Sequence, residues 1–376
     1  MVKGIHLTLM VGPAVPVPVS KEVIDALISI EVTTSSGTSQ SGFQMSFRLD
    51  KDSPLHTLFV LPRGKKLSIL RTVIIVTLNG TSEILMDGVV LHTQVSSGGE
   101  AGKQILTVSG KDLSAVMDIV ELDGIPYPAM PPFARVGLIL AKYASLGIIP
   151  KIIPSVIQDI TIPTEQIRRH KGTDLAYLKL LAQQSGYIFY IEPGPVPATS
   201  TAYWGPYIKV GAPQPALNTD MDAQTNVESI DFTFDKEKKE MPVVFIQNEE
   251  SKAVIPIPIP DITPLNPPLG AVPPIPPKIK FMYETANKTP FNALMHGLAY
   301  ASQNSDCLFA DGSLDVLRYG RILKARKLVG VRGAGVAYNG LYYVSSVTHK
   351  IRRGEYKQNF KLSRNGLIST IPKVPV

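Results

Sequence analysis

The chain has one cysteine, Cys307, among its 376 residues. A single thiol excludes a disulfide within the chain and a cysteine cluster for zinc or iron–sulfur, and it fits a fold built in a reducing cytoplasm. The sequence also lacks a run of about 18 apolar residues, the length that spans a bilayer. The apolar residues 4–19 contain three prolines, which break the helical core of a secretion signal. We therefore expect a soluble component.

Residues that carry out chemistry are also scarce. The six histidines are scattered and no HExxH run occurs, so no metal site is expected. His170, between Arg169 and Lys171, is expected on a solvated basic loop. His349 is expected to pack or to form a hydrogen bond within a strand.

Two glycine-rich stretches resemble nucleotide-binding loops only superficially. The run at residues 97–104 has Ser97 at the first glycine position of a phosphate-binding loop and Gln104 where a Ser or Thr would meet magnesium. The run Gly330-x-x-Gly333-x-Gly335 leads into another predicted strand, so the helix N-terminus that holds a pyrophosphate is missing. We expect no cofactor.

Alternation with a period of two predicts β-structure near both ends of the chain. Residues 43–49 and 356–362 each alternate apolar with polar side chains, as half-buried strands do. Asn79-Gly80 predicts a tight turn between strands.

The segment between these β-regions predicts a helix followed by a strand. Thr173 or Asp174 can cap a helix whose apolar stripe includes Leu178 and Leu181, and Gly186 ends it in a left-handed conformation.

Residues 254–277 are the most unusual in composition, reading VIPIPIPDITPLNPPLGAVPPIPP. Proline excludes a helix or a central strand there, so the prediction is an extended, polyproline-like strap that lies against a surface. Thr289-Pro290 then predicts the start of another helix.

The net charge of +7 is unevenly spread. Between Asp315 and Gly366, twelve Lys and Arg stand against two acids. Such a stretch could contact nucleic acid, or it could meet an acidic partner subunit or line a channel. The second interpretation is favoured, because the aromatic platform of single-strand binders is missing.

Two groups of motifs together resemble a known family. The first is Gly172-Thr173-Asp174, Leu178, Leu181-Ala182 and Gly186-Tyr187. The second is Gly312-Ser313-Leu314-Asp315-Val316, Gly320, Leu323, Ala325-Arg326, Gly340-x-Tyr342-Tyr343-Val344, Val347-Thr348-His349 and Phe360-x-Leu362-x-Arg364. The pattern resembles tail hub proteins: the phage late-control D proteins and the matching hub part of VgrG spikes in contractile injection machines.

The resemblance implies a fold of class α+β, mainly β, with two tube-like antiparallel β-barrel domains and a small mixed α+β insert. The expected boundaries are 1–110 for the first barrel, 111–210 for the insert, 211–253 for the start of the second barrel, 254–280 for the strap and 281–376 for a helix and the rest of the second barrel. The Pro-rich strap has no counterpart in the family motif.

The resemblance also implies a structural role and no enzyme activity. A homotrimer would present six barrels to a hexameric tail tube, with baseplate wedge proteins and a spike as further partners. Because the chain ends at Val376, soon after the last predicted strand, the spike is expected to be a separate protein. No small-molecule substrate is expected, and nucleic acid would at most pass through the lumen. The implied location is the tail baseplate of a virion or injection particle, assembled in the bacterial cytoplasm.

Seven residues are candidates for a subunit or partner interface. They are Trp204, Tyr207, Arg318, Arg321, Arg326, Arg352 and Arg353. The aromatic pair suits contacts that are part apolar and part wet, and the arginines belong to the basic stretch.

Two alternatives remain open. A tail-associated peptidoglycan hydrolase would need paired carboxylates, for which Glu249-Glu250 and Asp220 with Asp222 are the candidates. A receptor- or glycan-binding tail component would use Trp204 and Tyr207 to stack on a sugar.

Overall fold

The computed structural model describes residues 4–13, 15–36, 40–50, 53–60, 69–97, 104–154, 167–247, 253–260, 266–285 and 289–371. Most of its strands belong to one sheet of 13 strands, which confirms the α+β, mainly β class. Within these ranges the strand ladder does not close into a barrel. No helix in the same ranges is both long and apolar enough to cross a membrane.

The N-terminal part of the sheet is here called the first β-unit. Its elements are β1 (Ile5–Gly12), β2 (Val17–Pro18), α1 (Lys21–Ala26), β3 (Leu27–Ser35), β4 (Gly42–Leu49), the π-helix η1 (His56–Val60), β5 (Arg71–Leu78), β6 (Thr81–Ser97) and β7 (Gln104–Asp112). The predicted alternation places Phe43 and Phe47 of β4 in the core. Asn79 and Gly80 both have positive φ, 49° and 83°, and form the predicted turn.

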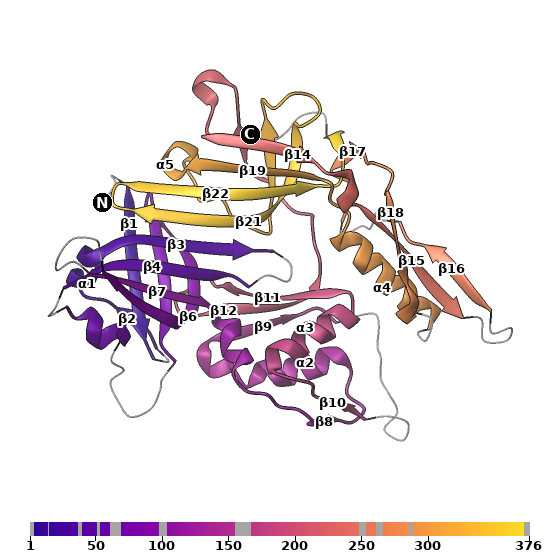
Figure 1. Cartoon of the computed structure of the whole chain (residues 1–376), viewed down its shortest axis with the longest axis horizontal. Helices are drawn as coiled ribbons and strands as arrows, with labels where there is room; N and C mark the ends of the chain where they lie inside the picture. The colour runs from indigo at the N-terminus through magenta and orange to yellow at the C-terminus, as the bar shows by residue number, and fades with distance from the viewer. Residues whose placement is uncertain are drawn as a thin grey trace.

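A mixed α/β insert follows the first β-unit (Figure 1). It comprises η2 (Leu113–Asp118), β8 (Pro126–Tyr127), α2 (Pro132–Ala141), η3 (Ala144–Leu146), β9 (Ile148–Ile152), β10 (Arg168–Arg169), α3 (Asp174–Gln184), β11 (Tyr187–Pro193) and β12 (Ser200–Pro206). Thr173 caps α3 by accepting a hydrogen bond from the Ala176 N–H at 3.1 Å, as predicted. Gly186 follows the helix with φ 69°. Helices α2 and α3 pack with the sheet β11-β12-β9 around a separate apolar core.

The second β-unit completes the large sheet. It contains β13 (Gln214–Asn218), η4 (Asp222–Gln224), β14 (Ser229–Phe234), β19 (Leu308–Asp315), α5 (Val316–Tyr319), β20 (Leu328–Arg332), β21 (Gly340–Arg352), β22 (Glu355–Arg364) and β23 (Leu367–Ser369). One continuous apolar core runs through both β-units.

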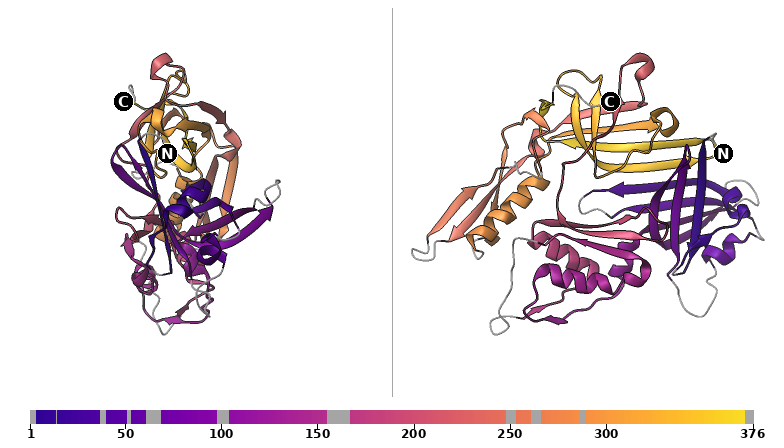
Figure 2. Two further views of the ribbon diagram at one scale, coloured as in Figure 1. Left: turned by 90° about the vertical axis from the view of Figure 1, so that its left-hand side faces the viewer. Right: turned by 180° about the vertical axis from the view of Figure 1, so that it is seen from behind.

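An arm projects from the second β-unit, as the front and rear views show (Figures 1 and 2). Its elements are η5 (Lys236–Lys238), β15 (Glu240–Gln247), β16 (Val254–Pro258), β18 (Lys278–Met282), η6 (Tyr283–Thr285) and α4 (Pro290–Gln303), while β17 (Gly270–Val272) pairs with β23. Thr289 caps α4, as predicted.

In the Pro-rich segment the structure describes residues 254–260 and 266–277, which include the strands β16 and β17. Strand β16 is the edge strand of the order β16-β15-β18. The Ile259 N–H donates to the Pro242 carbonyl at 2.9 Å. Since neighbouring residues of a strand point their N–H groups to opposite sides, Pro256 and Pro258 carry their missing donors on the outer side, where no bond is lost.

Candidate functional site: the joint between two repeated β-units

Five strands of each β-unit repeat one topology, while the strand that flanks them differs: β1 pairs antiparallel with β5, and β13 pairs parallel with β20. In the first, strands β3, β4, β5, β6 and β7 follow one another along the chain and pair in the order β3-β4-β7-β6-β5. In the second, β14, β19, β20, β21 and β22 pair in the order β14-β19-β22-β21-β20. A short helix follows the second strand of each unit, η1 after β4 and α5 after β19. The arm lies between β14 and β19, where the first unit has a short connection.

The units are joined edge to edge by β3 and β21. Strand β21 forks: Gly340–Tyr343 pairs with β20, and Ser346–Arg352 pairs antiparallel with β3. A bulge between Val344 and Ser346 separates the two halves. At the joint the hydroxyls of Thr33 and Thr348 lie 3.0 Å apart.

A polar face crosses this joint without a break. One row of cross-strand neighbours passes through six strands, β22, β21, β3, β4, β7 and β6, and consists of Lys357, Lys350, Glu31, Gln44, Ser109 and His92. The opposite face of β22, β21, β3, β4 and β7 carries the apolar core. Strands β14 to β7 lie one below another in Figure 1, so the two β-units present a single wall.

Arg326 ties the joint to the insert. Its guanidinium carbon lies 4.0 Å from the centre of the Tyr190 ring in β11, and its Nη2 donates to the Ser35 carbonyl at 2.6 Å. Nearby, Lys324 and Glu83 form an ion pair between the two β-units at 2.6 Å. Arg326, a predicted interface residue, therefore joins three parts of one chain.

The predicted aromatic pair lies largely inside the chain. The Trp204 side chain is 0% exposed and packs in the core of the insert, edge-on to Tyr187 at 4.8 Å between ring centres. Tyr207 is half-buried and packs edge-on against Tyr343 at 5.4 Å. Burial raises the pKa of Tyr207 well above its usual value. Placing Trp204 at a surface is thus wrong, because β12 is the central strand of its sheet and α3 covers it.

The remaining predicted arginines are exposed. Arg318 and Arg321 flank the end of α5, and Arg352 and Arg353 lie at the β21–β22 turn. Both places are at the same end of the second β-unit, since Asp315 pairs with Lys357 close to that turn.

Several cations of the basic stretch between Asp315 and Gly366 are paired with acids in the folded chain. Acids from distant segments pair with several of its cations: Lys324 with Glu83, Lys357 with Glu228, Lys361 with Asp311 and Arg353 with Asp25. Arg364 is fully buried, and its three nitrogens donate to the carbonyls of Gly366, Asn339 and Ala337. These contacts reduce the net positive potential expected from the linear count.

The predicted environment is confirmed for His349 and wrong for His170. His349 is buried and bonds the Tyr356 hydroxyl at 2.8 Å, as predicted, and burial lowers its pKa to about 3. The expectation of a solvated His170 is wrong: its ring is 1% exposed, and Nδ1 lies 2.9 Å from the Tyr127 hydroxyl. Its Nε2 lies 3.5 Å from Asp174, so it braces the start of α3.

Of the carboxylate candidates for hydrolysis, only Asp220 and Asp222 lie among the described residues. Both are exposed with φ 48°; Asp220 lies in a loop, and Asp222 begins η4. Glu249 and Glu250, like most of the run at residues 97–104, lie outside the described residues. Among the described residues, no group of three or more His, Cys, Asp and Glu could hold a metal ion.

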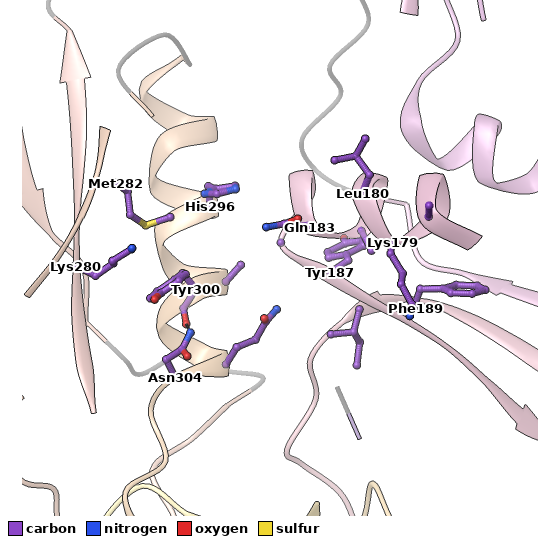
Figure 3. A pocket seen from close by; sticks show the side chains of 16 residues that line it. Lys179, Leu180, Gln183, Tyr187, Phe189, Lys280, Met282, His296, Tyr300 and Asn304 are labelled. Carbon is purple, nitrogen blue, oxygen red and sulfur yellow. Dashed lines mark hydrogen bonds between the residues drawn. The ribbon is translucent and has the colours of Figure 1, made fainter. Parts of the chain in front are cut away.

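A cavity of about 660 Å³ lies between the insert and the arm (Figure 3). Helix α3 and strand β11 line one side, with Lys179, Gln183 and Tyr187; α4 lines the other, with His296 and Tyr300. Gly186 brings the two sides together, because a methyl group there would overlap the Ala299 Cβ of α4.

Comparison with known proteins supports the fold. No protein-family model matches the chain, and no curated protein matches it. Solved structures do. A tail protein from Neisseria meningitidis is 13% identical with a TM-score of 0.64, covering 97% of this chain and 98% of its own. The 43 kDa tail protein of a Shewanella oneidensis prophage is 14% identical with a TM-score of 0.61, covering 96% and 98%.

A chain of the PdpA–VgrG complex from Francisella is also similar. It is 9% identical with a TM-score of 0.61, and the match covers 99% of this chain and 60% of that one. At such identities the likeness speaks for the fold. The chain therefore has the fold of phage tail proteins and of a chain of the PdpA–VgrG complex, in agreement with the resemblance of its sequence motifs.

Proposed function

We propose that this protein is a structural tail hub, which joins a hexameric tail tube to a threefold spike in a contractile phage tail or injection particle. The observation that carries the proposal is the repeat: five strands of each β-unit pair in the same order, and the two units are fused through β3 and β21 into one wall. One chain thus supplies two nearly equivalent surfaces. Three chains would supply six, which matches a sixfold ring by shape alone.

The polar face is the proposed lining of the axial channel. Its row of Ser, Gln, Glu and Lys side chains is well hydrated and has few aromatic or apolar groups to hold a passing molecule. Nucleic acid or protein cargo would pass along it without stable binding. In this proposal the expected boundaries 1–110 and 111–210 remain those of the first tube-like unit and the insert, whereas the arm, from η5 to α4, extends beyond the expected strap at 254–280 on both sides.

The exposed ends of the β-units are the proposed contacts with other proteins. Arg318, Arg321, Arg352 and Arg353 lie at one end of the second β-unit and suit an acidic ring of tube protein. The arm, with its Pro-rich strand β16, suits a wedge protein or a neighbouring copy, and the spike would lie at the opposite end. No enzyme activity is part of this proposal.

Mass measurement tests the hub directly. Multi-angle light scattering of the purified chain should give the mass of a trimer, and negative-stain images should show a ring with threefold symmetry. The chain should also bind its tube protein, and reversing the charges of Arg352 and Arg353 to Glu should weaken that binding while the trimer persists. A chain that stays monomeric and does not bind the tube would overturn the proposal.

A further inference from the structure

We infer that two strand edges of this chain pair with each other between neighbouring copies: the second half of β6 with β14 of the next copy. The inference rests on the proposed trimer and specifies which strands meet and in which register. The internal joint between β21 and β3 is the template, because β6 is the counterpart of β21 and β14 is the counterpart of β3.

Strand β6 forks as β21 does. On one edge its first half pairs with β5, as Gly340–Tyr343 of β21 pairs with β20; on the other edge, residues 88–97 pair with β7, the counterpart of β22. The bulge follows Val90 in β6 and Val344 in β21. Each of these valines donates its N–H at 2.9 Å to the carbonyl just before the neighbouring strand, Leu70 before β5 and Lys327 before β20. Where β21 then meets β3, the second half of β6 has no second strand beside it within the described residues.

Strand β14 has the matching open edge. It pairs with β19 alone among the described strands, whereas β3 has β4 on one side and β21 on the other. The difference shows in burial. Ile30 and Val32 of β3 are 1% and 0% exposed, while the corresponding Ile230 and Phe232 of β14 are only half-buried.

The second half of β6 is likewise more exposed than the corresponding part of β21. All residues from Leu91 to Ser97 are exposed, although they form a strand. Val95 is 46% exposed, whereas its counterpart in β21, His349, is buried. A strand that must stay unpaired usually carries Lys or Pro on its edge. Neither the β6 sequence LHTQVSS nor the β14 sequence SIDFTF has either residue.

The template also fixes the register. Thr348 lies opposite Thr33 at the joint, so Gln94 of one copy should lie opposite Thr233 of the next. The Ser36 N–H donates to the Ser345 carbonyl. Ser36 and Ser345 are therefore a hydrogen-bonded pair, and Thr33 and Thr348 lie three positions farther along the same ladder. Because hydrogen-bonded and non-hydrogen-bonded pairs alternate, Thr33 and Thr348 form a non-hydrogen-bonded pair, the kind whose side chains are closest. Two different strands form this contact, so it is head-to-tail and can close a ring.

Cysteine cross-linking in the full chain tests the register. Under mild oxidation, Gln94→Cys combined with Thr233→Cys should convert the chain to a covalent trimer on a non-reducing gel. The native Cys307 is buried and does not compete. The matched control combines Gln94→Cys with Ser229→Cys, which is four residues along the same strand, roughly 13 Å away, and should stay uncross-linked. Thr33→Cys with Thr348→Cys should form a disulfide within each chain and shows that the oxidant works.

A second variant gives an independent measurement. The N–H of Val95 should point to the open edge, so Val95→Pro should shift the mass from trimer to monomer while circular dichroism stays unchanged, and Val95→Thr should leave the trimer intact. If the chain is trimeric and the Gln94/Thr233 pair fails to cross-link while the Thr33/Thr348 pair does, the edge pairing is wrong and the hub proposal stands. A chain that is monomeric by light scattering overturns both.

Discussion

The buried ion pair between Arg71 of β5 and Asp87 of β6 lies within the first β-unit and should be the strongest single anchor for the insert. Arg71 Nε and Nη2 contact the two Asp87 oxygens at 2.7 and 2.6 Å, and the side chains are 3% and 0% exposed. The same groups hold the insert: Arg71 Nη2 donates to the Ala198 carbonyl at 2.9 Å, and the Ser200 hydroxyl donates to Asp87 at 3.0 Å.

Removing one charge of this pair should cost much more stability than removing both. Asp87→Asn keeps the size of the side chain but leaves the Arg71 guanidinium buried without a counter-ion, which should lower the free energy of unfolding by about 3–5 kcal/mol. In the double variant Arg71→Met, Asp87→Leu, no buried charge remains. Its loss should therefore be smaller, within about 1–2 kcal/mol of the parent.

Urea unfolding provides the assay. Trp204 is the chain's one tryptophan and lies in the core of the insert, so its fluorescence follows the insert while circular dichroism follows the sheet. Asp25→Asn is the matched control, because the exposed Arg353–Asp25 pair should contribute nothing measurable. A double variant as unstable as Asp87→Asn alone would refute the reasoning from an uncompensated charge.

Three further results are expected. Burial lowers the pKa of His349 to about 3, so protonation of this group opposes folding. Its contribution to the free energy of unfolding is complete above its unfolded pKa near 6.5 and falls by about 1.4 kcal/mol per pH unit below it. In urea unfolding from pH 7 to 4, His349→Gln should remove that slope. Gly186→Ala should destabilise the folded chain by at least about 1–2 kcal/mol, because Gly186 has a positive φ and a methyl group there overlaps Ala299. Adding Ala299→Gly should restore only the part of the loss that is due to the overlap, which melting curves would measure. Trp204→Ala should cost about 3–5 kcal/mol by urea unfolding; unchanged stability with lost glycan binding would instead favour a sugar site.

Local features were predictable because their causes are local. A capping hydroxyl at Thr173, a left-handed residue at Gly186 and a turn at Asn79-Gly80 depend on the backbone within a few residues. The alternation in β4 and β22 likewise identifies strands, and the motif residues resemble the right fold. The class of fold therefore follows from the sequence alone.

Partners across the chain were not predictable, because period two identifies a strand and its buried face but not the strand beside it. Only the tertiary structure pairs β3 with β21, although Thr33 and Thr348 are 315 residues apart. It also buries His170 and Trp204, which local sequence places at the surface, because α3 and its sheet close over them. Charge behaves in the same way: a Coulomb interaction depends on distance in space, so the acids that neutralise the basic stretch come from segments remote in sequence.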